Sequence, residues 1–174
     1  TYGSELAHKK NNNYENSIYL LDKLIKKYTK NLVINTTKVD ILTAFGNYSD
    51  ALILVDKFLE ISPKNYPLSI SKSKLLLAMK SYFESEEIIR DQLLRKNDDP
   101  ELWLLLSEIQ RNSQNILGYH QSRAEYYLLL GQDEQALNQL EFALKMTQNN
   151  FQASERIMTK IVDIKKDLGC LLYT

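Results

Sequence analysis

Histidine and cysteine are the side chains in this sequence best suited to metal binding or nucleophilic attack. His8 and His120 lie far apart, and neither belongs to an HExxH motif or to a Cys/His cluster. A zinc site needs three or four ligands that converge on the ion, and this chain does not readily supply them. We therefore predict no metal centre and expect both histidines to be ordinary helix-surface or groove residues.

Other patterns of catalytic residues are not found in the sequence either. Cys170 is the single cysteine and stands in the tail Gly-Cys-Leu-Leu-Tyr-Thr, with no base near it in the sequence. The five glycines are isolated, so no glycine-rich loop is available to cradle a phosphate. No serine stands in a nucleophile-elbow pattern. We predict that the chain binds no cofactor and is not in itself an enzyme.

Composition narrows the class of protein. The 174 residues include 22 basic and 22 acidic side chains, so the formal net charge is zero. Nucleic-acid-binding proteins usually show a basic face, and we expect no nucleic-acid partner. The longest apolar runs, 102–106 and 126–130, are far shorter than the roughly 20 residues of a membrane span. Glycine and proline are scarce, at 5 and 3, which favours helices joined by short turns.

Tyrosines recur at a constant interval, at Tyr14, Tyr48 and Tyr82. A small residue follows each tyrosine after three positions, and aliphatic residues follow after seven and eleven. This pattern and this spacing are typical of the tetratricopeptide (TPR) repeat, a helix-turn-helix unit of about 34 residues. In this interpretation Gly46 permits the turn before Tyr48, and the small residue lies where two helices cross. The small residues are Ser17, Ala51 and Ser85, and the aliphatic residues are Leu21, Val55, Ile89, Ile25, Leu59 and Leu93.

The pattern continues into the C-terminal half of the chain. Trp103 begins the Trp-x-x-Leu motif of a first repeat helix, and Asp98 or Asp99 can cap that helix. The last hairpin begins half a repeat early, so the helix near 115–130 serves two hairpins.

Two lysines depart from the repeat. Lys38 and Lys72 stand where it usually has an apolar residue. Either their aliphatic stems pack while the ammonium groups reach solvent, or the register of these helices slips by one residue. The sequence leaves both interpretations open.

We predict an all-α fold, a TPR-type α-solenoid of about ten antiparallel helices that form a superhelix with a concave groove. Residues 1–168 are assigned to a single TPR domain and 169–174 to a tail. The repeats are about 1–30, 31–64, 65–98 and 99–130, then an overlapping hairpin at 118–150 and a capping helix at 151–168. The expected helices are 2–11, 14–28, 32–45, 48–61, 66–79, 82–95, 101–112, 115–130, 133–147 and 151–168.

A groove of this kind is lined mainly by the first helix of each repeat, and we expect it to bind a protein or peptide segment. The candidate residues are mixed in charge and lack the Lys/Asn/Lys/Arg set that clamps a terminal carboxylate in co-chaperone TPR domains. For each of them the alternative is an exposed helix residue without a ligand, and the tyrosine and tryptophan positions are assigned to the core. The candidates are Thr36, Asp40, Thr43, Ile70, Lys74, Leu77, Leu104, Glu108, Arg111, His120, Gln121 and Glu125.

The stretch 118–157 carries three motifs in order: His-Gln-x-Arg-Ala-Glu-Tyr, then Gly-x-x-x-x-Ala, then Asn-Phe-Gln-x-x-x-Arg-Ile. It resembles the C-terminal region of BepA-type metallopeptidases, zinc proteases of the Gram-negative periplasm. The stretches DDPELWLLLSE at 98–108 and NYPLS at 65–69 add to a likeness that covers about 46–168. The matching residues are His120, Gln121, Arg123, Ala124, Glu125, Tyr126, Gly131, Ala136, Asn150, Phe151, Gln152, Arg156 and Ile157.

In that family a catalytic zinc domain precedes the TPR domain, and the protein supports outer-membrane protein assembly and quality control. None of that catalytic domain is in this sequence. The resemblance implies a non-catalytic domain of a periplasmic metalloprotease that contacts its own protease domain, substrates or the assembly machinery. The alternative is a free-standing cytoplasmic TPR scaffold or co-chaperone adaptor. Within the motif, Arg123 and Glu125 are two residues apart and cannot pair on one helix face, so each needs another partner.

Overall fold

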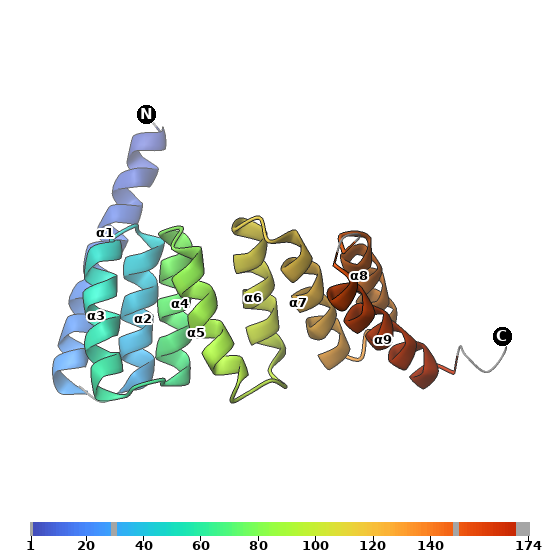
Figure 1. Cartoon of the computed structure of the whole chain (residues 1–174). Helices are drawn as coiled ribbons and strands as arrows, with labels where there is room; N and C mark the ends of the chain where they lie inside the picture. The colour runs from blue at the N-terminus through green and yellow to red at the C-terminus, as the bar shows by residue number, and fades with distance from the viewer. Residues whose placement is uncertain (1, 29–30, 148–149, 170–174) are drawn as a thin grey trace. The chain divides into compact units, whose positions relative to one another are not determined.

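The computed structural model describes residues 2–28, 31–147 and 150–169, and within these ranges the chain forms nine α-helices and no strand (Figure 1). The side chain of His8 and the whole of Cys170 lie outside the described residues. The helices are α1 (Tyr2–Lys27), α2 (Leu32–Ala44), α3 (Tyr48–Ile61), α4 (Tyr66–Ala78), α5 (Tyr82–Leu93), α6 (Pro100–Asn112), α7 (Ile116–Leu129), α8 (Asp133–Lys145) and α9 (Phe151–Asp167).

The predicted helix boundaries hold to within two residues for α2 to α9. The first two predicted helices, 2–11 and 14–28, are wrong as separate elements, because the chain runs through both as the single helix α1. Asn11, Asn12 and Asn13 lie between them in the sequence. Asparagine is only moderately unfavourable in a helix interior, and no glycine or proline interrupts this stretch, so nothing ends the helix there.

The chain leaves α2, α4 and α6 through the same turn. Gly46, Lys80 and Gln114 lie one repeat length apart, and their φ angles of 79°, 64° and 62° place all three in the left-handed region. Each turn is closed by a backbone hydrogen bond from the next residue back into the helix, as in a Schellman motif. The expected role of Gly46 in the turn is confirmed. The three bonds run from Asn47 N to Leu42 O (2.9 Å), Ser81 N to Leu76 O (2.9 Å) and Asn115 N to Gln110 O (2.8 Å).

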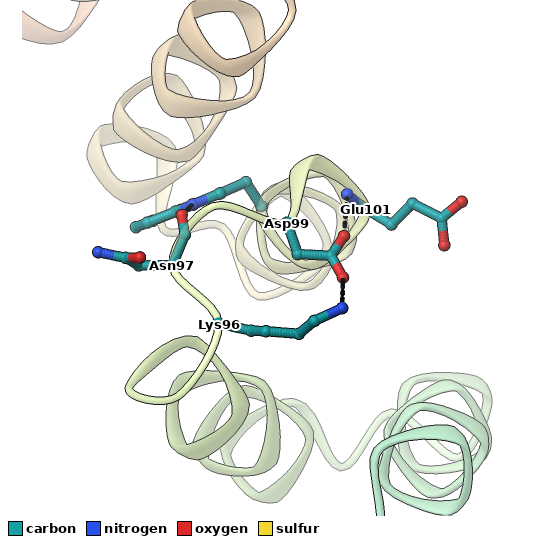
Figure 2. Close-up of polar contacts among 5 residues, drawn as sticks. Lys96, Asn97, Asp99 and Glu101 are labelled. Carbon is teal, nitrogen blue, oxygen red and sulfur yellow. Dashed lines mark hydrogen bonds and ion pairs between the residues drawn. The ribbon is translucent and has the colours of Figure 1, made fainter.

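The starts of the same helices are also capped at intervals of one repeat length. Asn31, Asn65 and Asp99 each accept a hydrogen bond from a backbone N–H in the first turn of α2, α4 and α6. Figure 2 shows the last of these, in which Asp99 Oδ1 accepts from Glu101 N at 3.0 Å and Oδ2 accepts from Lys96 Nζ at 3.3 Å. Of the two aspartates that the sequence offers, Asp99 is therefore the cap of α6.

The chain divides into two compact units, Thr1–Ile88 and Ile89–Thr174. In the first unit α2, α3 and α4 pack on one another. Their core includes Val39, Ala51, Val55 and Leu75, all fully buried, so the small residue at the predicted helix crossing lies in the core. Tyr14 and Tyr48 pack against this core, as the repeat pattern predicts.

Two ion pairs explain the lysines at apolar positions of the repeat. Lys38 Nζ of α2 lies 2.5 Å from Asp22 Oδ1 of α1, and Lys72 Nζ of α4 lies 2.7 Å from Asp56 Oδ1 of α3. The lysine side chains are only 16% and 27% exposed, so their stems pack while the ammonium groups meet a carboxylate. The register of these helices therefore does not slip.

In the second unit α7 packs against both α6 and α8, as expected of a helix shared by two hairpins. Ile157, Ile161 and Ile164 of α9 are buried in one core cluster with Ala124 of α7 and Leu140 of α8. The final helix thus covers apolar side chains of the preceding hairpin. The assignment of 1–168 to a single domain stays a prediction.

Candidate functional site

A cavity of about 280 Å³ lies within the second unit and is lined by side chains of α6, α7, α8, α9 and the last turn of α5. Its apolar lining includes Leu106, Leu140 and Ile157, which are 1%, 2% and 3% exposed and belong to the packed interior. The cavity therefore rests on the packed core, whereas other lining side chains, such as that of Arg156, are exposed.

A buried amide fixes the side of the cavity where α6 meets α7. Gln110 is 1% exposed, and its Oε1 accepts a hydrogen bond from Ser122 Oγ at 2.7 Å. Gly118 lies against it, because a Cβ atom at residue 118 would stand 2.8 Å from Gln110 Nε2 and 2.7 Å from Asn115 Nδ2. The absence of a side chain at Gly118 lets the two helices approach closely.

Charged residues from two helices meet at the same cavity. Glu125 Oε1 of α7 pairs with Lys160 Nζ of α9, across a sequence separation of 35 residues. Arg156 lies four residues before Lys160, so both face the same side of α9. Arg90 of α5 also lines the cavity. The cavity wall therefore combines one carboxylate with three cationic side chains.

An indole completes the wall. Trp103, in the first turns of α6, is held by a hydrogen bond from its Nε1 to Asn97 O at 2.8 Å. Asn97 belongs to the same loop as the capping residue Asp99 (Figure 2). The cap and this bond together fix the start of α6, and the half-buried ring contributes a flat apolar surface to the cavity.

The predicted residues of α7 divide between two sides of the helix. Gln121 and Glu125 line the cavity. His120 instead faces α8, where its Nδ1 lies 2.8 Å from Gln139 Oε1 and its ring stacks on Phe142 at 5.4 Å between centroids. The structure thus brings two of the three predicted residues of this helix into one site.

The predicted residues of α6 lie outside the cavity. Leu104, Glu108 and Arg111 are exposed, and the cavity is lined instead by Trp103 and its neighbours along another stripe of the helix. With 3.6 residues per turn, neighbouring residues point about 100° apart, so a stripe one residue further along faces elsewhere. These three stay predictions as binding residues of a different face.

In the first unit, the predicted groove residues lie on α2 and α4. Thr36 Oγ1 donates to Leu32 O at 3.0 Å and Thr43 Oγ1 donates to Val39 O at 2.8 Å, so both hydroxyls bond within their own helix. A cavity of about 420 Å³ between α1, α2 and α3 is lined by Asp22 and Lys38 among others, and by none of the predicted residues. Asp40 and Lys74 are exposed, whereas Ile70 and Leu77 are half-buried.

The expectation that Arg123 and Glu125 need separate partners is confirmed. Glu125 pairs with Lys160, and Arg123 Nη2 donates to Tyr127 Oη at 2.5 Å while its guanidinium lies 4.7 Å from the Tyr127 ring. Among the residues that the structure describes, no group of three His, Cys, Asp or Glu side chains is placed to hold a metal ion. Nor does any described helix have the length and apolarity of a membrane span.

The predicted groove residues do not include Arg90, Arg156 or Lys160, and Trp103 is assigned to the core in that prediction. The sequence-based prediction assigns the C-terminal helix to a cap, and it includes Arg156 only as a residue that matches the BepA-type motif. The sequence does indicate that Arg156 and Lys160 share one face of the helix, because they stand four residues apart, beside the buried Ile157. Their position opposite Glu125 follows only from the packing of α9.

No protein family model matches the chain. No curated protein matches it either. Solved structures do. MamA from Desulfovibrio magneticus RS-1 superposes with a TM-score of 0.59 at 14% identity, over 95% of this chain and 93% of that chain. A tetratricopeptide repeat protein from Parabacteroides merdae gives 0.53 at 15% identity, over 89% and 67%. A thermophilic TPR protein from Thermus thermophilus gives 0.51 at 12% identity, over 90% and 95%.

The fold is a TPR α-solenoid. The turns and caps that recur at one repeat length and the likeness to TPR structures agree on this point. At 12% to 15% identity the likeness concerns the fold alone. What the TPR domain binds therefore depends on its own side chains.

Proposed function

We propose that this TPR domain is a non-catalytic protein–protein interaction domain whose second unit receives a segment of a partner protein. Stacked helical hairpins offer extended surfaces to protein partners, which is the common use of repeat folds. The cavity on α6, α7 and α9 is the observation that carries the proposal. It joins a buried apolar floor to a charged wall, the combination by which a pocket anchors and orients a bound group.

The size of the cavity limits what it can take. Ligand pockets commonly enclose about 300 to 1,000 Å³, and this one, at about 280 Å³, lies at the lower end. It suits one or two side chains of an extended segment. Binding would therefore rest on a small anchor, with the rest of the segment lying over the neighbouring surface.

The finer proposal is that the domain belongs to a periplasmic zinc metallopeptidase and binds substrates, its own protease domain or the outer-membrane assembly machinery. Its support is the resemblance of 118–157 to BepA-type enzymes. Residues of two of its motifs, Gln121, Glu125 and Arg156, line one cavity although they come from α7 and α9. A binding role would explain why motif residues from two helices lie at one cavity. The alternative of a cytoplasmic adaptor has no such support from individual residues.

Site-specific photo-crosslinking in native cells tests the interaction. A photoreactive amino acid placed at Gln121 should yield an adduct with a discrete protein. The same residue at Glu108, on the exposed stripe of α6, is the matched control. An adduct at Glu108 and none at Gln121 would show that partners use the other face. No adduct at either position, with the protein folded and expressed, would reject this unit as an interaction surface.

The periplasmic context has a separate test. An immunoblot of fractionated native cells, with an antibody raised to this TPR domain, should show a periplasmic band well above the 20.3 kDa of the chain. A cytoplasmic band near that mass would establish the free-standing adaptor instead.

A further inference from the structure

We propose that the cavity of the second unit binds an acidic side chain within an internal segment of the partner, with an apolar neighbour of that side chain resting on Trp103. The inference rests on the proposed function, since it names the chemistry of the segment that the cavity receives. It is carried by the charges around the cavity and by their partners within the fold.

The single carboxylate of the cavity wall is already neutralised. Glu125 pairs with Lys160, and both side chains are about one-third exposed, so the pair stands at the cavity without being sealed from solvent. A basic ligand would have to compete with Lys160 for this carboxylate. The acid therefore leaves the cavity no uncommitted negative charge to attract a cation.

Positive charge remains after this pairing. Arg156 is exposed, and within the described ranges no side chain forms an ion pair or hydrogen bond with it. Arg90 adds a second charge to the wall, although it also interacts within the chain. An arginine presents two parallel N–H donors that match a carboxylate, and Arg156 and Lys160 on one face of α9 can engage one acidic group together.

The repeat register shows how this charge arises. Asp22 and Asp56 occupy equivalent positions of successive repeats, and each pairs with the lysine of the helix that follows, Lys38 or Lys72. The next equivalent position carries Arg90, and the lysine position carries Leu106. The aspartate–lysine ion pair of the two earlier repeats is thus replaced here by an arginine and a leucine, and both of these residues line the cavity.

The same cavity wall indicates that an apolar side chain stands next to the acidic side chain of the partner. Trp103 is half-buried, and its only indole N–H is committed to Asn97 O. What the ring offers the cavity is apolar surface, which suits an aliphatic or aromatic side chain. An acidic residue next to an apolar one meets both requirements within the small volume available.

Trp103 is the only tryptophan of the chain, so its fluorescence reports occupancy of this cavity directly. The full chain is titrated with the terminally blocked peptide Ac-Gly-Leu-Glu-Phe-Glu-Gly-NH2. Matched peptides carry glutamine or lysine in place of glutamate, and a fourth keeps glutamine but ends in a free carboxylate. We expect a saturable fluorescence change with the glutamate peptide and at least about tenfold weaker binding of the other three, the difference that one charge-assisted contact makes.

Variants assign the effect to named charges. Arg156→Gln should weaken binding of the glutamate peptide about tenfold, whereas Lys166→Gln, in the last turn of the same helix and away from the cavity lining, should leave it unchanged. Glu125→Gln should strengthen binding about threefold, because it removes a repelling carboxylate and releases Lys160. Circular dichroism confirms that each variant is folded.

Several results would overturn the inference. Equal binding of the glutamine peptide would remove charge as the determinant, and preference for the lysine peptide would reverse the sign. Binding of only the free-carboxylate peptide would show capture of a chain terminus. Weaker binding by Glu125→Gln, or equal loss in Arg156→Gln and Lys166→Gln, would also reject the assignment. If crosslinks form at Gln121 but no acidic peptide binds, the interaction proposal stands and this inference alone fails.

Discussion

Replacing Lys80 or Gln114 by glycine should stabilise the protein. Both residues have positive φ, at 64° and 62°, in turns that Gly46 makes with the same hydrogen bonds at φ 79°. A residue with a Cβ atom pays about 1–2 kcal/mol for the left-handed conformation. Glycine avoids this strain but loses about 0.5–1 kcal/mol of additional chain entropy on folding. The balance favours glycine by about 0.5–1 kcal/mol in the free energy of unfolding at each site.

The structure indicates that this cost is conformational. A Cβ atom built on Gly46 would meet nothing within 4 Å, so the turn has room for a side chain. The reverse change, Gly46→Ala, should therefore destabilise by about 1 kcal/mol without any clash. Because Lys80 and Gln114 are exposed, their side chains contribute little packing that the glycine variants would lose.

Equilibrium unfolding in urea, followed by circular dichroism and by Trp103 fluorescence, checks both sites. Lys80 belongs to the first unit, and Gln114 belongs to the second unit together with Trp103. Gln114→Gly should therefore raise the fluorescence midpoint. Lys80→Ala and Gln114→Ala are the controls, since they keep the Cβ atom and should change the unfolding free energy by less than about 0.5 kcal/mol. If the glycine variants are no more stable than these alanine controls, the strain argument is wrong.

Three further substitutions probe packing and capping, each measured by the same unfolding experiment. Ala51→Leu should cost about 1–3 kcal/mol because Ala51 is fully buried where helices pack, and unchanged stability would contradict that crossing. Asp99→Ala should cost about 1 kcal/mol through loss of the α6 cap, while Asp98→Ala should be nearly neutral; equal effects would show that the cap is misassigned. Gly118→Ala should cost about 1–2 kcal/mol and weaken peptide binding, because its Cβ atom would displace Gln110 from the cavity wall; a stabilised variant with normal binding would refute that close approach.

The helices α2 to α9, the turn at Gly46 and the cap of α6 could be predicted from the sequence because their causes are local. Residues one repeat length apart take the same roles, as the caps Asn31, Asn65 and Asp99 show. The exception is α1, for which two helices were expected. A boundary that no glycine or proline marks cannot be read from local signals alone, since the surrounding chain decides whether the helix continues.

The candidate site could be predicted only in part. Gln121 and Glu125 were found because they lie on a helix whose groove-facing side the repeat register indicated. On α6 the same reasoning selected Leu104 and Glu108, whereas the cavity is lined along another stripe of that helix. Predicting which residues line a groove requires knowing which stripe of each helix faces its neighbours. Because successive residues point about 100° apart, an error of one residue in the register selects a different face of the helix.

The sequence alone predicts helical hairpins that recur at one interval up to the half-repeat step near 115–130, with small residues at the helix crossings and a turn at Gly46. The contact of Glu125 with Lys160, far along the chain, and the position of Arg156 and Trp103 at one cavity follow from the tertiary packing and not from the sequence pattern. The repeating pattern of residues indicates how each helix packs on the next, because those contacts recur along the chain. It does not indicate a contact that occurs once between helices that are not consecutive, such as the Glu125–Lys160 pair of α7 and α9.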